Sequence, residues 1–284
     1  MKSFIKYTMA TVVGIFLTMT LFTIISIISL AGMMATEGMS APIKEKSILR
    51  INLVGELTER SVFDPIAMLM GEPETDVVLE DALLALKKAA RNDKIKGVYL
   101  EAAGLTATPA MAQELRQALV EFKKSGKWIV AYGDSYSKTD YYLSSVADSV
   151  LLNPEGVVDF SGMASQIMFF KDVLKKIGVN IQVFKVGTYK SAVEPFICTE
   201  MSPANREQVT SYLSSIWANM LKDVSDSRGV EVEKLNALAD TLTMFSDPVN
   251  AVKGSLVDKL CYLDEVKAVL RERCGLSDDD DDLV

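Results

Sequence analysis

The segment from residue 183 to 196, VFKVGTYKSAVEPF, holds the side chain best suited to proton transfer in this sequence. An apolar, β-rich run leads into Gly187, and Lys190 follows the turn among apolar neighbours. A lysine becomes a useful base when apolar surroundings disfavour its ammonium form and lower its pKa. The local sequence is compatible with Lys190 as a general base, but it does not establish this role. Most lysines in loops are solvated, and Lys185 in the same segment is a second candidate.

The absence of histidine narrows the chemistry further. Ser-His-Asp triads, Cys-His dyads and H-E-x-x-H zinc sites all need an imidazole, so this sequence cannot build them by itself. The three cysteines, Cys198, Cys261 and Cys274, form no C-x-x-C pair, and the last two could be a disulfide or free thiols. No Gly-rich phosphate loop or metal-ligand cluster is present either. We therefore expect no cofactor and no metal.

Three carboxylates are weaker candidates for the same chemistry. Glu101 follows a predicted strand at 95–100 and could act as an acid–base group, although a carboxylate at a strand end is commonly solvated. Glu194 and Glu200 flank the lysine segment and could orient Lys190 by hydrogen bonding.

Alternating strands and helices must position these residues. Thr108-Pro109 and Ser202-Pro203 each combine a capping side chain with a proline suited to the first helical position. The predicted strands are 48–54, 95–100, 128–132, 149–152 and 181–186. The predicted helices are 79–90, 109–126, 139–147, 169–177, a long one after 203, 232–239 and 263–273. This alternation is typical of parallel βαβ units and predicts an α/β fold.

A long apolar run precedes this domain. Residues 7–36 carry no charge, and 12–34 are long enough to span a bilayer and longer than the core of a cleaved signal peptide. We predict an uncleaved signal anchor, with cleavage as the alternative. Lys2 and Lys6 place the N-terminus in the cytoplasm, so the rest lies on the far side. The predicted divisions are 1–36 tip and transmembrane anchor, 37–47 stalk, 48–275 main domain and 276–284 acidic linker.

The charge balance argues against nucleic acid as a partner. The formal net charge is −8, whereas nucleic-acid binding depends on a basic surplus. Much of the excess is the run Asp278 to Asp282, which is typical of a solvated linker. Leu283 and Val284 then resume apolar sequence, which we interpret as the first step towards a second domain.

Several of these motifs occur together in one known family. Residues 186–196, VGTYKSAVEPF, with Met201-Ser202-Pro203 and Arg206-Glu207, resemble the lysine segment of the long-form bacterial signal peptide peptidases, also called protease IV or SppA. Residues 141–145 and 154–159 are similar to that family as well, and so is an N-terminal anchor before βαβ units. The resemblance covers nearly the whole chain and includes eleven consecutive residues.

The resemblance implies a fold and a divided catalytic site. The family has a ClpP/crotonase-like fold of repeated ββα units, in two tandem copies in the long form. Carried over, Lys190 is the general base that accepts a proton from a serine hydroxyl of the other copy. The family's serine lies in a Ser-Gly-Gly-Tyr-type element, where this sequence has Lys138-Thr139-Asp140-Tyr141. Because glycines there let backbone N–H groups reach an oxyanion, we expect this chain alone to be inactive.

The resemblance also implies partners and a location. It predicts a homotetramer in the bacterial inner (plasma) membrane, in contact with lipid through its N-terminal helix, with a periplasmic main domain that degrades remnant signal peptides. Two alternatives remain. The chain could be a non-catalytic, membrane-anchored scaffold for oligomerisation, or a crotonase-type acyl-CoA enzyme, against which the far-side placement counts.

Overall fold

The computed structural model describes residues 2–37, 42–60, 76–241 and 243–276. The chain divides into two compact units, Met1–Lys44 and Glu45–Val284. Parts of the predicted stalk (38–41), of the predicted main domain (61–75 and 242) and of the predicted acidic linker (277–284) lie outside the described residues. The boundaries predicted there stay predictions.

The N-terminal unit is built on one helix, α1 (Lys2–Glu37). Its segment Ser3–Ser29, 27 residues, is apolar and long enough to cross a membrane. At 1.5 Å per residue this segment extends about 40 Å, more than the roughly 30 Å of a bilayer's hydrocarbon core. Threonine hydroxyls such as those of Thr8 and Thr18 donate to carbonyls four residues earlier, which satisfies them in an apolar medium. A signal sequence shares these features, so α1 is compatible with an anchor or a signal.

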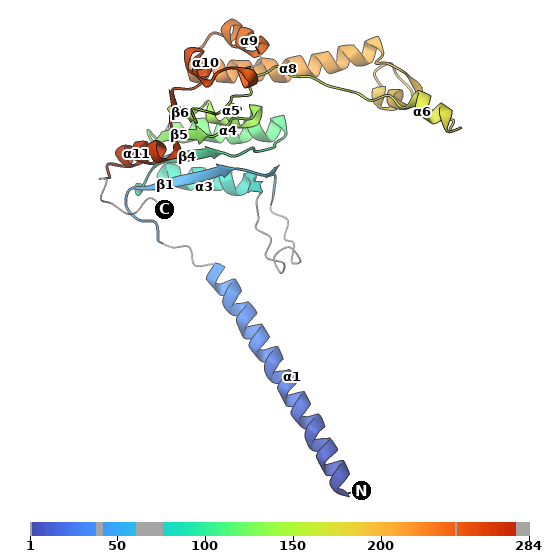
Figure 1. Cartoon of the computed structure of the whole chain (residues 1–284), viewed down its shortest axis with the longest axis vertical. Coiled ribbons are helices and arrows are strands. Elements are labelled where there is room, and N and C mark those ends of the chain that lie inside the picture. The colour runs from blue at the N-terminus through green and yellow to red at the C-terminus, as the bar shows by residue number, and fades with distance from the viewer. Residues whose placement is uncertain (1, 38–41, 61–75, 242, 277–284) are drawn as a thin grey trace. The chain divides into compact units, whose positions relative to one another are not determined.

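The second unit is organised around a parallel sheet (Figure 1). Within the described residues five strands pair in the order β1-β4-β5-β6-β7, and every pairing is parallel. The strands are β1 (Ser47–Leu53), β4 (Ile95–Ala102), β5 (Trp128–Gly133), β6 (Ser149–Leu152) and β7 (Lys259–Leu260). This arrangement confirms the predicted α/β class.

A second, shorter row of pairing lies beyond the ends of these strands. β2 (Leu57–Thr58) follows β1 and pairs in parallel with β3 (Val77–Val78). Two isolated parallel bridges add to this row: Glu56 with Thr106, and Tyr136 with Val158. A short extended piece thus follows each of β1, β4, β5 and β6, as repeated ββα units require.

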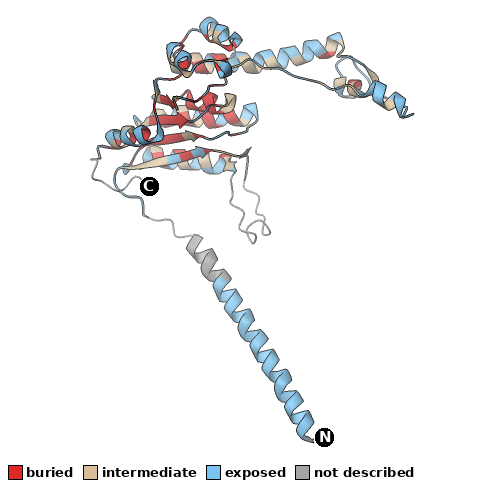
Figure 2. Cartoon of the chain, in the orientation of Figure 1, coloured by how far each residue is buried: buried red, intermediate tan, exposed pale blue. Residues whose placement is uncertain are grey.

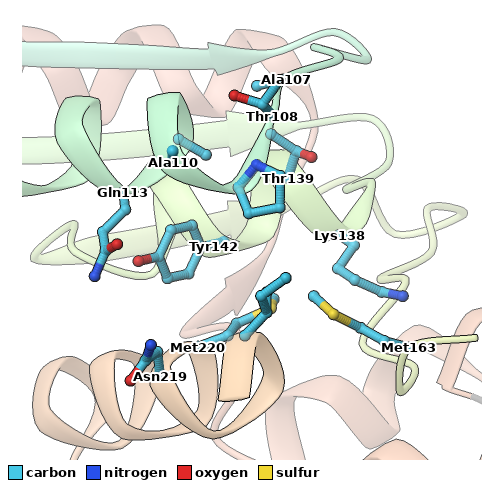
Figure 3. A pocket seen from close by; sticks show the side chains of 13 residues that line it. Ala107, Thr108, Ala110, Gln113, Lys138, Thr139, Tyr142, Met163, Asn219 and Met220 are labelled. Carbon is cyan, nitrogen blue, oxygen red and sulfur yellow. The ribbon is translucent and has the colours of Figure 1, made fainter. Parts of the chain in front are cut away.

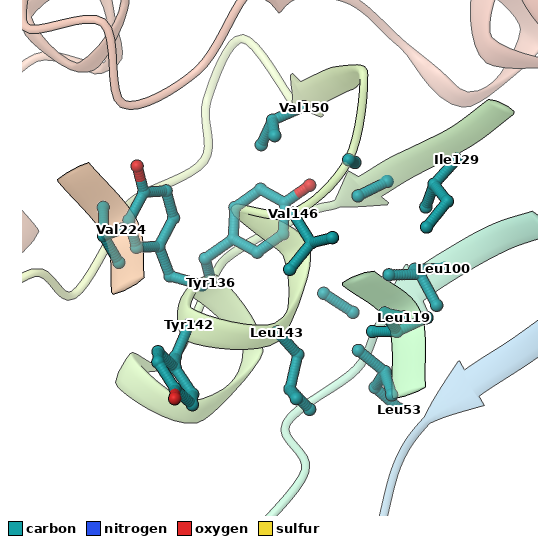
Figure 4. Packing of buried hydrophobic residues seen from close by; sticks show 14 of the residues in the cluster. Leu53, Leu100, Leu119, Ile129, Tyr136, Tyr142, Leu143, Val146, Val150 and Val224 are labelled. Carbon is teal, nitrogen blue, oxygen red and sulfur yellow. The ribbon is translucent and has the colours of Figure 1, made fainter. Parts of the chain in front are cut away.

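Three helices cover one face of the sheet: α3 (Leu79–Arg91), α4 (Pro109–Lys123) and α5 (Lys138–Ser144). They bury Leu86, Leu119 and Leu143 against Leu100 and Ile129 of the strands, in the largest apolar cluster of the unit (Figure 4). α4 begins as predicted, because the Thr108 hydroxyl accepts a hydrogen bond from the N–H of Met111 at 3.4 Å.

The opposite face of the sheet is covered by α11 (Leu263–Cys274). Val266 and Leu270 of this helix pack in a second cluster against Tyr99 and Tyr132. Coverage on both faces explains why most residues of β4 and β5 are buried, as Figure 2 shows.

The longest helix of this unit, α8 (Pro203–Arg228), has two distinct parts. Its C-terminal part buries Leu221 and Val224 in the main core and ends before Gly229, whose φ of 64° suits glycine. Its N-terminal part is mostly exposed. The smaller elements after it are α9 (Val232–Asp240), the 3₁₀ turn η2 (Thr243–Phe245) and α10 (Pro248–Lys253).

Residues 168–201, called the arm below, contain little regular structure. Its elements are α6 (Lys171–Lys176), the 3₁₀ turn η1 (Ser191–Val193) and α7 (Glu194–Ile197). The strand predicted at 181–186 is wrong: these residues form no strand, and the side chains of Phe184 and Val186 are 95% and 90% exposed. β7, not this segment, pairs with β6, so the arm's apolar, β-rich sequence has no strand partner here.

A buried arginine connects α4, α5 and α8. Arg116 is 3% exposed, and its Nη2 donates to the carbonyl of Asp223 and to Ser227 Oγ. The guanidinium lies 5.0 Å from the centre of the Tyr142 ring, and the Tyr142 hydroxyl donates to the Asp223 carboxylate. The hydrogen bonds of Arg116 therefore add to the apolar packing that holds the C-terminal part of α8 against the core.

Replacing Arg116 by alanine is expected to lower the free energy of unfolding by about 2–4 kcal/mol, because the acceptors on α8 lose a charged donor and a cavity forms. Urea denaturation of the detergent-solubilised chain measures the change. The exposed Lys124, which pairs with the exposed Glu121, is the control, and Lys124→Ala should cost less than about 1 kcal/mol. Equal effects of the two substitutions would contradict this role.

Candidate active site on the arm

Lys190 lies at the end of a tight turn on the arm. Gly187 adopts a φ of 102°, a conformation that favours glycine, and Lys190 then serves as the N-cap residue of η1. The lysine side chain is exposed. The apolar burial that its local sequence suggested is therefore absent within this chain.

A buried carboxylate fixes the turn that follows Lys190. Glu194 is 2% exposed, and its Oε1 accepts a hydrogen bond from the Ser202 hydroxyl at 2.6 Å. Its Oε2 accepts from the Ser202 N–H at 3.2 Å and from Asn205 Nδ2 at 2.9 Å. Ser202 also caps α8 through the N–H of Asn205. Glu194 thus joins the lysine segment to the start of a 26-residue helix.

These hydrogen-bond donors favour the ionised form of Glu194. The hydrogen bonds from Ser202, helped by the one from Asn205, hold the pKa of this carboxyl below its ordinary value despite its burial. The ionised form is also favoured because it lies at the N-terminus of α8. The sequence suggested that Glu194 could orient Lys190 directly, but its oxygens bind the start of α8 instead, and Glu200 is exposed.

Two further contacts hold the arm together. The Tyr189 hydroxyl donates to Glu207 Oε2 on α8 at 3.2 Å, immediately before the lysine. The rings of Phe170 and Phe196 stack with centres 6.3 Å apart, which connects α6 to α7. Residues on both sides of Lys190 are therefore tied to the first turns of α8.

A hollow of about 550 Å³ lies beside the lysine. Its lining residues are Phe184, Lys185, Val186, Tyr189, Lys190, Ser191, Ala192, Val193 and Gln208. The side chains of Phe184, Val186 and Tyr189 are more than half exposed, although such side chains are usually buried. The amine is thus presented at a concave, largely apolar surface.

The alternative acid–base candidate has a structural partner. Glu101 lies within β4, and its Oε2 accepts from Arg50 Nε on the neighbouring strand at 2.7 Å. The positive charge of Arg50 balances the negative charge of this carboxylate across the two strands. Glu101 is therefore a poor candidate for the base.

The place where the resemblance puts a serine is occupied by a charge. Lys138 is the first residue of α5, and its Nζ donates to the carbonyl of Gly162 at 2.7 Å. Asp140 is fully buried and accepts hydrogen bonds from the backbone N–H groups of Gly104 and Leu105, both at 3.1 Å. This pair of amides follows β4 and could otherwise bind an oxyanion. A carboxylate of the chain itself already fills that place.

Ser202, Asn205 and the two amides held by Asp140 were not identified from the sequence as parts of a site. The sequence pointed near them in two ways: Ser202-Pro203 is a helix start within the stretch that resembles the family's lysine segment, and Asp140 lies in the stretch that replaces the family's serine element. The hydrogen bonds of Asp140 to the two amides could not be predicted, because these backbone donors lie more than 30 residues away along the chain.

The thiols form neither a bridge nor a metal site. Cys261 and Cys274, which the sequence left open as a pair, are separate buried thiols, and burial raises the pKa of each. Over the described ranges, no group of three or more cysteine, aspartate or glutamate side chains could hold a metal ion.

Comparison with known proteins places this site in a family. The model of peptidase family S49 matches residues 121–277, more than half of the chain, including the whole arm. The chain belongs to peptidase family S49. The family expected from the lysine segment is thereby confirmed as an S49, SppA-like one.

Curated relatives of this S49 chain are considerably longer. Protease 4 of Salmonella typhi is 37% identical over 207 residues, which cover 70% of this chain and 33% of that protein. Protease 4 of Haemophilus influenzae is 37% identical over 160 residues, 55% of this chain and 25% of the relative. The chloroplastic serine protease SPPA of Arabidopsis thaliana is 27% identical over 237 residues, 84% and 34% respectively. The S49 chain thus spans about a third or less of these relatives.

Among solved structures, one described as an enoyl-CoA hydratase/isomerase from Acinetobacter baumannii covers 70% of each chain. Its TM-score is 0.39 at 15% identity, a likeness too low to carry fold or activity over to the S49 chain.

Proposed function

We propose that this chain is the membrane-anchored part of a signal peptide peptidase-type serine protease, in which Lys190 is the general base. The observation that carries the proposal is the presentation of Lys190 at an exposed apolar hollow, on a turn fixed by the buried Glu194. An exposed apolar surface of this kind is typical of a site that another protein module covers. The names of the relatives, Protease 4 and serine protease SPPA, support the reaction class.

In this proposal a second module supplies the serine and completes the site. Its docking covers Phe184 and Val186 and removes water from the amine, which favours the neutral form that can accept a proton. The amine then takes the proton of the serine hydroxyl as the oxygen attacks a peptide carbonyl. The same ammonium returns a proton to the leaving amine.

The oxyanion donors must come from the same second module. In this chain the amides of Gly104 and Leu105 are bound by Asp140, and Lys138 stands at the start of α5. The same occupied amides count against the acyl-CoA alternative, because a thioester oxyanion would need free donors at this place.

The remaining parts of the proposal concern location and assembly. α1 anchors the chain in the bacterial plasma membrane with Lys2 and Lys6 in the cytoplasm, and the main unit faces the periplasm. Remnant signal peptides are the substrates, and the assembled enzyme is a homotetramer. A non-catalytic scaffold is the second candidate, which the exposure of Lys190 in the isolated chain favours.

A chimera with a relative tests the reaction class. The matching part of Salmonella typhi Protease 4 is replaced by this chain, and hydrolysis of a quenched fluorescent peptide with a Leu-rich centre is measured. The chimera is expected to cleave the peptide, whereas the chain alone neither cleaves it nor reacts with a fluorophosphonate probe. A chimera that folds and assembles like Protease 4 yet remains inactive would favour the scaffold.

A further inference from the structure

A second cavity, of about 450 Å³, lies between α4, α5 and α8, away from the residues that line the hollow at Lys190. This volume falls within the range of ordinary ligand-binding pockets, about 300–1,000 Å³. Its walls are formed mainly by the small or flexible apolar side chains of Ala107, Ala110, Met163, Ile216 and Met220. Methionines adapt to different partners, so such walls suit apolar groups of varied shape.

Polar groups stand at the two ends of this α4–α5–α8 pocket (Figure 3). Gln113 of α4 and Asn219 of α8 lie at one end beside Tyr142, and Lys138 lies at the other. In the part of the chain that the structure describes, the carboxamides of Gln113 and Asn219 make no hydrogen bond. No carboxylate lines the pocket.

These groups fit a peptide better than other apolar ligands. A carboxamide offers both donors and an acceptor, which matches the backbone N–H and C=O of an extended chain. The apolar walls between the two ends suit a single bulky side chain. The lining has no anionic group to repel a peptide carbonyl or carboxylate.

The pocket adjoins the place where cleavage would need an oxyanion site. Asp140 follows Thr139, a lining residue, and its buried carboxylate occupies the amides of Gly104 and Leu105. A peptide bound in the pocket therefore meets no free pair of amides at this place, and the serine at the start of α5, the N-cap Ser137, has its hydroxyl hydrogen-bonded to Asp140. The pocket can therefore bind a peptide but has no groups placed to hydrolyse it.

We propose that the α4–α5–α8 pocket binds one bulky apolar side chain of an extended peptide and holds that peptide without cleaving it. The pocket shares no lining residue with the hollow at Lys190, so the proposal does not depend on Lys190 being a base.

Binding to the detergent-solubilised full chain tests the proposal. The probes are two fluorescent octapeptides, blocked at both ends, that differ only in a central Leu or Ser, and fluorescence anisotropy gives each Kd. The Leu peptide is expected to bind at least about tenfold more tightly, since an apolar pocket discriminates roughly 10–200-fold per methylene-sized difference. Equal affinities for the two peptides would overturn the proposal.

Variants locate the binding site. Ala110→Phe fills the pocket from an exposed helical position and should weaken Leu-peptide binding at least about tenfold. Gln117→Phe places the same ring on an exposed part of α4 that does not line the pocket, and Lys190→Ala removes the proposed base; both should bind like the parent chain. Asn219→Leu gives a second test if Ala110→Phe is misfolded by circular dichroism, and should reduce affinity at least threefold.

Two outcomes contradict the proposal. Unchanged peptide affinity in folded Ala110→Phe or Asn219→Leu would place the peptide elsewhere. A change in sedimentation behaviour with unchanged peptide affinity would instead make the pocket a contact between copies of the chain. Full proteolysis by the Lys190→Ala chimera together with tighter binding of the Leu peptide would overturn the base role and leave this inference standing, so the two proposals fail separately.

Discussion

Replacing Lys190 by alanine in the Protease 4 chimera is expected to lower kcat by about 10²–10⁴-fold, the usual contribution of a positioned general base. KM should change little, because the amine accepts a proton and does not hold the rest of the substrate. Lys190→Met, which keeps most of the side-chain length, should lose as much activity as Lys190→Ala. The measurement is the initial rate with the quenched peptide over a range of concentrations.

The matched control is Lys185→Ala, because Lys185 is an exposed lysine of the same arm that lines the same hollow. We expect its kcat to stay within about threefold of the parent chimera, a change of less than about 1 kcal/mol in the barrier. Circular dichroism and gel filtration should show that all variants fold and assemble alike. If Lys190→Ala retained activity and Lys185→Ala lost it, the roles of the two lysines would be reversed.

Replacing Glu194 by alanine is expected to release the turn that carries Lys190. Ser202 and Asn205 would lose a buried charged acceptor, at a cost of about 2–4 kcal/mol in the local stability of the arm. Hydrogen exchange followed by mass spectrometry should show faster exchange across 189–205 and unchanged protection in β4 and β5. In the chimera kcat should fall at least about tenfold, because the amine is no longer held in one place.

The control for this effect is Glu200→Ala, which removes an exposed carboxylate six residues further along the chain. It should leave both the exchange rates and kcat close to those of the parent. Glu194→Gln keeps the size of the side chain but brings an NH₂ group against donors, so it should behave more like alanine than like the parent. Parent-like exchange across 189–205 in Glu194→Ala would show that the carboxylate does not fix the turn.

Lowering the pH should weaken the contact between Glu194 and the start of α8. The pKa of Glu194 is lowered in the folded chain, so its stabilising effect is present above the ordinary carboxyl pKa of 4.5. That effect is lost as the pH falls through the lowered value in the folded state. The difference in arm exchange between the parent and Glu194→Ala should accordingly be full at pH 6 and shrink at pH values below about 4.5.

Local sequence determined much of the framework. Thr108-Pro109 and Ser202-Pro203 predicted the starts of α4 and α8, because a cap needs only a hydroxyl and the N–H groups three residues ahead. The central strands were predicted for a similar reason, since a run of β-branched and apolar residues buried on both faces can be recognised without knowing its neighbours. The lysine segment and its family were also identified from consecutive residues.

Tertiary structure decided the features that depend on partners distant in sequence. Residues 181–186 have the composition of a strand, but a strand needs a neighbour for its backbone hydrogen bonds, and β7 holds the place beside β6. Lys190 is exposed although its sequence neighbours are apolar, because the arm turns those apolar side chains outward. Its exposure could therefore not be predicted from the local sequence. Asp140 and the α4–α5–α8 pocket were equally hidden. The hydrogen bond of Asp140 to Leu105 joins residues 35 positions apart, and the pocket brings together α4 and α8 residues more than 100 positions apart, so only folding places these groups near one another.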